Sequence, residues 1–116
     1  MKRSDSIEKV LGLLDAVTAG AQTHDVDAVV RRSLEDAGWL EAFTTGLGHG
    51  VGLQIHEDPF LSRPAPARLE RRTALTVEPG IYVPGRGGVR IEDTLVVTDG
   101  PAELLTVATK DLLELA

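Results

Sequence analysis

The chain has 116 residues and a formal net charge of −6, a length typical of one domain and sufficient to bury a core. Apolar residues make up 42%, which excludes a disordered chain, and the absence of cysteine excludes disulfide scaffolds, thiolate metal sites and cysteine nucleophiles. The acidic balance argues against a nucleic-acid partner. Because no apolar run reaches the roughly 18 residues of a transmembrane helix and no signal peptide is visible, we expect a cytoplasmic protein without membrane contact.

The first 45 residues are predicted to be helical, in two amphipathic segments that each need a surface to pack against. Asp5 begins the first segment, with Glu8 three positions later as in a capping box. Apolar residues then recur at helical spacing up to Gly20, at Ile7, Val10, Leu11, Leu14 and Val17. Thr23 is expected to cap a second helix that ends at Gly38. Its first turn holds Asp25 and Asp27, and its apolar face comprises Val26, Val29, Val30 and Leu34.

Residues 46–58 have a different composition. The stretch from Gly46 to Gly52 contains four glycines in seven residues, each costing about 1 kcal/mol relative to alanine in a helix, which excludes a helix there. Glycine inside a strand usually marks a bulge or a close backbone approach. Residues 59–72 are rich in proline and arginine, and are predicted to form a linker.

From residue 73 onward the pattern is typical of β-structure. Residues 73–78 alternate, with Leu75 and Val77 on one face and Thr76 and Glu78 on the other. The segments that follow are strand 81–83, turn 84–88, strand 89–98, a hairpin turn at Asp99-Gly100, strand 103–107 and a short last helix from Thr109 to Leu115. In the long strand, one face is expected to carry Val89, Ile91, Leu95 and Val97.

This order of elements, helices first and then an antiparallel sheet, predicts an α+β fold. We expect a single domain over residues 1–116, helical over 1–45 and with the sheet and the site residues over 46–116.

Two histidines in the glycine-rich segment could carry chemistry. His49 lies between two glycines, which leave its imidazole unshielded, although a lone histidine is more often structural than a ligand. His56 follows seven residues later. In an extended segment this odd spacing places the two side chains on opposite faces, whereas a bulge at a glycine brings them together. The sequence leaves both arrangements open.

Glu78 and Glu92 are carboxylates within otherwise apolar or β-branched strands. They could belong to a solvated outer face, where Glu92 forms a weak surface ion pair with Arg90. They could instead point into a cleft beside His49. One histidine and two glutamates form a nitrogen and oxygen site suited to Mn, Co, Fe or Zn, and the residues alone do not separate these possibilities.

Three motifs in order resemble those of the pita-bread metallopeptidases, and more narrowly the Xaa-Pro dipeptidase (prolidase) and Xaa-Pro aminopeptidase branch. They are Gly48-His49-Gly50-Val51-Gly52-Leu53 with His56-Glu57, then Thr76-Val77-Glu78-Pro79-Gly80-Ile81-Tyr82, then Gly87-Gly88-Val89-Arg90-Ile91-Glu92-Asp93. The resemblance runs from about Ala16 to the C-terminus. It implies the C-terminal half of a pita-bread fold, which consists of two α+β halves related by pseudo-twofold symmetry.

The resemblance also implies residue roles. His49, Glu78 and Glu92 would be ligands of a divalent metal such as Mn, Co or Zn, with Glu78 also exchanging a proton with the attacking water. His56 would stabilise the developing oxyanion as a catalytic residue. Tyr82 and Arg90 would shape the pocket for a proline-containing peptide.

The sequence departs from the family pattern at two points. The family's dinuclear site uses two further aspartates, upstream of the helix that corresponds to residues 6–19, and no aspartate here has the strand context those ligands need. A histidine that contacts substrate in many proline peptidases is replaced by Thr45. We therefore expect no metal or one weakly bound ion. Because one half of such a fold alone would expose the surfaces that normally pack against the other half, we also expect a homodimer or association with a chain that supplies the other half.

Three functions are compatible with these residues. The first is a portion of a metal-dependent Xaa-Pro peptidase that cleaves the bond before proline and is weak or inactive alone. The second is a truncated, non-catalytic module that binds peptides or partners. The third, a metal-independent hydrolase of the creatinase type, is the least favoured because this half retains its metal-ligand set.

Overall fold

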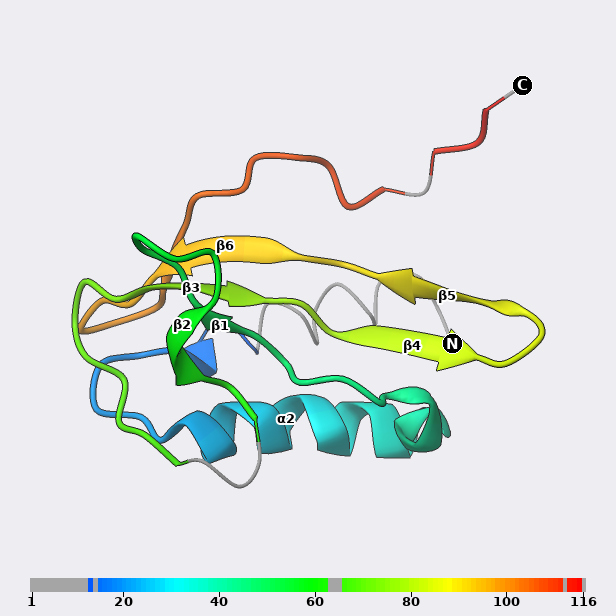
Figure 1. Ribbon diagram of the computed structural model, residues 1–116, viewed down its shortest axis with the longest axis horizontal. Helices are drawn as coiled ribbons and strands as arrows, with labels where there is room; N and C mark the ends of the chain where they lie inside the picture. The colour runs from blue at the N-terminus through cyan, green and yellow to red at the C-terminus, as the bar shows by residue number, and fades with distance from the viewer. Residues whose placement is uncertain (1–12, 14, 63–65, 112, 116) are drawn as a thin grey trace.

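The computed structural model describes residues 13, 15–62, 66–111 and 113–115. One long helix lies beneath an antiparallel sheet, and a two-stranded arm extends beyond the sheet (Figure 1). In chain order the elements are α2 (Thr23–Asp36), the 3-10 helix η1 (Leu40–Ala42), β1 (His49–Gly50), β2 (Glu57–Phe60), β3 (Ala74–Val77), β4 (Gly80–Val83), β5 (Gly87–Arg90), β6 (Asp93–Val96) and β7 (Glu103–Leu104). None of the helices in these ranges has the length and apolar content to cross a lipid bilayer.

Helix α2 forms where the sequence predicts it. Val26 and Val30 are buried, and Gly38 takes a positive φ of 76° just beyond the end of the helix, a conformation that glycine adopts without steric cost. The cap differs from the prediction, because Gln22 is the N-cap residue and Thr23 already lies inside the helix. The Thr23 hydroxyl instead accepts a hydrogen bond from the backbone N–H of Ala67, at 2.9 Å.

The first predicted helix lies largely outside the described residues. Residues 13, 15 and 16 are helical, and the side chains of Leu13 and Val17 are buried. Both belong to the apolar cluster that α2 and the sheet share, which also contains Val26, Val30, Phe43, Leu47, Leu61, Leu69, Leu75, Val77, Leu95 and Val97.

The main sheet has five strands in the order β2-β1-β3-β6-β7, and all of its pairs are antiparallel. The predicted α+β fold with an antiparallel sheet is confirmed. Leu75 and Val77 of β3 turn toward the core together with Leu95 of β6, as the alternation in the sequence predicts.

The predicted strand over residues 89–98 is divided between two sheets. The β3–β6 ladder and the β4–β5 ladder share one register, with Val77 opposite Asp93 and Gly80 opposite Arg90. Between them Ile91 N–H donates to the Pro79 carbonyl at 3.2 Å, but Pro79 has no N–H to return the bond. The sheet is interrupted at this point.

This interruption corrects the expected common face of the long strand. Val89 and Ile91, on the arm side, are exposed, whereas Leu95 and Val97 are buried against the core. Apolar and polar residues therefore alternate on both sides of the interruption, but Val89 and Ile91 do not pack against the core.

Two further predictions about the chain's course are wrong. The predicted linker over residues 59–72 begins too early, because Pro59 and Phe60 belong to β2. The predicted short helix over residues 109–115 is not formed at residues 109–111 or 113–115, which are exposed. This segment runs along the outside of the molecule (Figure 1), and a helix this short is marginal without a packing surface.

The approach of β1 to β3 requires a glycine at position 48. A Cβ atom placed on Gly48 would lie 1.9 Å from the Thr76 carbonyl oxygen, which is far inside contact distance. The position confirms the expectation that a glycine here marks a close backbone approach. It also sets the distance between the two strands that carry the candidate site.

We expect Gly48→Ala to destabilise the protein by about 1–3 kcal/mol or more, because the backbone of β3 must move to admit the methyl group. Gly100→Ala is the matched control, since a Cβ at Gly100 meets no atom within 4 Å, and we expect a change within about 0.5 kcal/mol. Urea unfolding followed by circular dichroism measures both. Equal stabilities of the two variants would contradict the close approach.

Candidate metal and catalytic site

The centre of the candidate site is a contact between His49 and Glu78. His49 Nε2 lies 3.1 Å from Glu78 Oε1, and the two side chains are only 11% and 12% exposed. Backbone pairing produces this contact, because Glu78 N–H donates to the Leu47 carbonyl at 2.7 Å and so holds the end of β3 beside β1. The structure therefore brings together two of the three predicted metal ligands.

The ring orientation of His49 presents Nε2 to the carboxylate. His49 Nδ1 lies 2.9 Å from the Gly50 carbonyl oxygen, and because a carbonyl can only accept, we assign the proton to Nδ1. In neutral histidine, Nε2 then directs a lone pair at Glu78. Two electron-rich atoms at this distance are stable only with a proton or a cation between them.

The donor pair fits part of a metal site. Metal bonds to histidine nitrogen and carboxylate oxygen are about 2.0–2.2 Å long, so neighbouring ligand atoms lie roughly 3 Å apart. His49 and Glu78 already have that spacing, and a backbone carbonyl on the other ring nitrogen is the usual partner of a ligating histidine. These two residues could hold one edge of a divalent ion.

Thr76 holds both members of the pair. Its hydroxyl accepts a hydrogen bond from His49 N–H at 3.2 Å and donates one to Glu78 Oε1 at 2.9 Å. Thr76 is buried, and its hydroxyl is the hydrogen-bond partner of the buried His49 N–H and a second partner of Glu78 Oε1 beside His49. The residue roles predicted from the sequence include none for Thr76, although the alternation of residues 73–78 places it on the same face as Glu78.

His56 joins the site through an irregularity in the β1–β2 ladder. His49 pairs with Phe60 but Gly50 pairs with Glu57, so the register shifts between adjacent residues of β1. The intervening loop places the His56 ring 4.3 Å from the His49 ring, centroid to centroid. The arrangement that the sequence left open is thus the one in which the two histidines meet.

Arg90 and Tyr82 lie on the other side of Glu78. Arg90 Nη1 is 3.3 Å from Glu78 Oε2, and the Arg90 guanidinium carbon lies 5.7 Å from the Tyr82 ring centroid. Arg90 therefore forms its ion pair with Glu78 and not with Glu92, the partner that the sequence suggested. The two residues predicted to contact substrate are brought together, next to the carboxylate predicted to act on it.

Glu92 is not gathered with the other two predicted ligands. The shared register of the two ladders places residue 92 opposite residue 78, so the side chains would share one face of the ribbon. In the structure Glu92 is exposed. Within the described ranges, no group of three histidine, aspartate or glutamate side chains converges closely enough to hold a metal ion.

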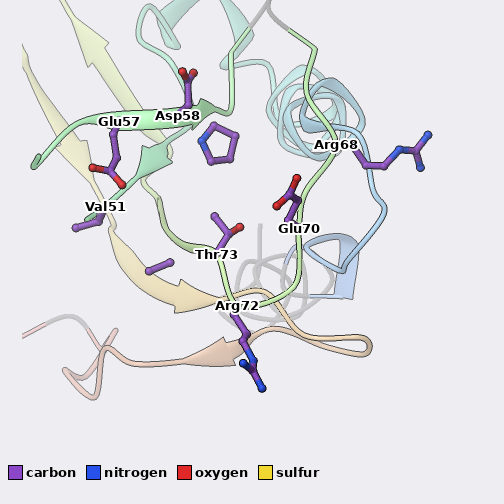
Figure 2. A pocket seen from close by; sticks show the side chains of 9 residues that line it. Val51, Glu57, Asp58, Arg68, Glu70, Arg72 and Thr73 are labelled. Atoms are coloured by element: carbon purple, nitrogen blue, oxygen red, sulfur yellow. The ribbon is translucent and has the colours of Figure 1, made fainter. Parts of the chain in front are cut away.

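A surface hollow of about 500 Å³ lies elsewhere on the sheet, and none of the predicted site residues lines it. Figure 2 shows Glu57 and Asp58 on β2, and Arg68, Glu70 and Arg72 on the segment before β3, with the two arginine side chains directed outward. Its lining residues are Val51, Glu57, Asp58, Pro59, Arg68, Glu70, Arg72, Thr73 and Ala74.

Comparison with known proteins places this geometry in a family context. A model of metallopeptidase family M24 matches residues 7–99. The Xaa-Pro dipeptidase of Pyrococcus furiosus is 40% identical over 100 residues, which are 86% of this chain and 29% of that protein. The likeness therefore extends beyond the three motifs.

Solved structures agree. The prolidase of Pyrococcus horikoshii superposes with a TM-score of 0.85 at 36% identity, covering 92% of this chain and 31% of that one. For the X-Pro aminopeptidase of Thermotoga maritima the TM-score is 0.86 at 35% identity, with coverage of 94% and 31%. The predicted partial pita-bread fold is confirmed, and the chain spans about three-tenths of the length of these relatives.

We expect Thr76→Val to destabilise the fold by about 1–3 kcal/mol, because the buried His49 N–H and the half-buried Glu78 Oε1 both lose their hydroxyl partner. Thr76→Ser, which keeps the hydroxyl, should retain most of that stability. Urea unfolding of both variants tests this. A Thr76→Val protein as stable as Thr76→Ser would show that the hydroxyl does not hold the pair.

Proposed function

Because the chain belongs to metallopeptidase family M24, we propose that it supplies part of a divalent-metal-dependent peptidase that hydrolyses the bond before proline in Xaa-Pro peptides. The observation that carries this proposal is the shielded pair of His49 Nε2 and Glu78 Oε1 at 3.1 Å. The similarity to an Xaa-Pro dipeptidase and a prolidase supports the substrate class.

His49, Glu78 and Glu92 are the proposed metal ligands in this part of the enzyme, with Mn, Co or Zn as the ion. The register that sets residue 92 opposite residue 78 supports the third ligand, because it places both side chains on one face of the ribbon. A bound divalent ion lowers the pKa of a coordinated water and polarises the scissile carbonyl.

The protein's own groups have distinct proposed roles in hydrolysis. Glu78 accepts a proton from the attacking water and returns it to the proline nitrogen as the peptide bond breaks. His56 is exposed beside His49, where its ring N–H can donate to the carbonyl oxygen as negative charge develops. Arg90 and Tyr82, stacked next to Glu78, hold the peptide.

The proposed enzyme needs more than this chain. The chain spans about three-tenths of its relatives, and the family resemblance calls for two aspartate ligands that we assign to no residue here. We propose that a complementary segment supplies them, or that the chain forms a homodimer. Alone, it should bind at most one ion weakly and turn over little or no substrate.

A second candidate function is a non-catalytic module that binds peptides or partners. The ion pair of Arg90 with Glu78 Oε2 favours it, because a guanidinium there neutralises the carboxylate without a metal. Metal binding separates this function from the first.

We expect isothermal titration with Mn²⁺ or Co²⁺ to detect weak binding that His49→Ala, Glu78→Ala and Glu92→Ala each abolish. Glu103→Ala is the matched control, since it removes an exposed carboxylate on β7 and should leave binding unchanged. No heat of binding at millimolar metal would favour the non-catalytic module.

Activity is a separate test. We expect the 116-residue chain alone to show little or no hydrolysis of an Xaa-Pro dipeptide, because its ligand set is incomplete. Ninhydrin detection of released proline measures this, with a full-length Xaa-Pro dipeptidase as positive control. Efficient turnover by the chain alone would contradict the requirement for a complementary segment.

The oligomeric state follows from exposed apolar surface. Val89, Ile91, Leu104 and Leu105 are all at least partly open to solvent on strands or next to them. Covering such surface favours association. Light scattering should therefore give about twice the 12.4 kDa chain mass, whereas a clean monomer would contradict the homodimer.

A further inference from the structure

We propose that Glu57 is the positioning residue of His56. Its carboxylate holds the loop of residues 52–56 in the one shape that sets the His56 ring against His49. The catalytic consequence rests on the proposed function, in which His56 donates to the developing oxyanion. The structural claim itself requires neither metal nor turnover.

The loop is closed around the Glu57 carboxylate. Glu57 Oε2 accepts a hydrogen bond from Gln54 N–H at 3.1 Å, and Gly52 N–H donates to the Gln54 carbonyl at 3.1 Å. The carboxylate also lies directly over Gly52, because a Cβ on that residue would fall 2.1 Å from Glu57 Oε1. At the neck of the loop, Gly50 pairs with Glu57 itself.

Burial of apolar side chains does not order this loop. Leu53 is 106% exposed and Ile55 is 74% exposed, so neither side chain packs on the body of the protein. A loop without such an anchor depends on its internal hydrogen bonds, and the bond from Gln54 to Glu57 closes its second half. His56 lies between the two residues that this bond joins, so the bond restrains the position of its ring.

The neighbouring acidic residue provides a matched control. Figure 2 shows the side chains of Glu57 and Asp58 on opposite sides of β2, with Glu57 on the side of Val51. Asp58 is exposed and carries the same charge. Replacing either residue by alanine removes one carboxylate from β2, but only the change at Glu57 removes the acceptor of the loop.

The test is a nuclear Overhauser measurement on histidine-labelled protein. Rings with centroids 4.3 Å apart give a cross-peak between the His49 and His56 ring protons. We expect Glu57→Ala to lose this cross-peak, Glu57→Gln to keep it because an amide oxygen still accepts from Gln54 N–H, and Asp58→Ala to keep it. Thermal unfolding of each variant verifies that the fold is retained.

An unchanged cross-peak in folded Glu57→Ala would overturn the proposal, as would an equal loss in Asp58→Ala. Should Glu57→Ala fail to fold, amide exchange in the unmodified protein decides: protection at Gln54 supports the bond to Glu57, and exchange at the rate of an open chain overturns it. The positioning role and the proposed function can fail separately. If Glu57→Ala loses the cross-peak but the chain never hydrolyses Xaa-Pro peptides, even with a complementary segment, the positioning role stands and the proposed function is contradicted.

Discussion

The candidate site depends on the close approach of β1 to β3. Gly48 permits it, because a side chain there would collide with the Thr76 carbonyl. Once the strands are this close, the Thr76 hydroxyl reaches both the His49 backbone and the Glu78 carboxylate. The glycine is therefore as necessary to the His49–Glu78 contact as the two side chains themselves.

The second constraint is the missing N–H of Pro79. It breaks the ladder between the main sheet and the β4–β5 arm at the point where Glu78 and Glu92 face one another by register. The arm carries Tyr82 and Arg90 past the end of the sheet, where Arg90 reaches Glu78. This interruption thus separates a packed part, which holds His49, from an arm whose strand β4 is half-buried and whose strand β5 is exposed.

Much of this arrangement was accessible from residue patterns. Helical spacing located α2, and alternation located β3 and its buried face, because those patterns report which side chains leave water. Prediction from residue patterns was wrong where a segment with a local helix preference has no surface to pack against, as in the short helix expected from Thr109. It was also wrong across residues 89–98, because an apolar alternation does not reveal that the partner strand contains a proline.

The sequence by itself determined the residue types of the site and their order along the chain, and hence the family. It also determined that residues 46–52 could not be helical, since glycine is costly in a helix. Only the tertiary structure decided which groups meet: His56 with His49, Arg90 with Glu78 rather than Glu92, and Thr76 with both His49 and Glu78. The physical reason is that register shifts and long-range backbone pairing set these contacts, and neither is encoded in the spacing of any one segment.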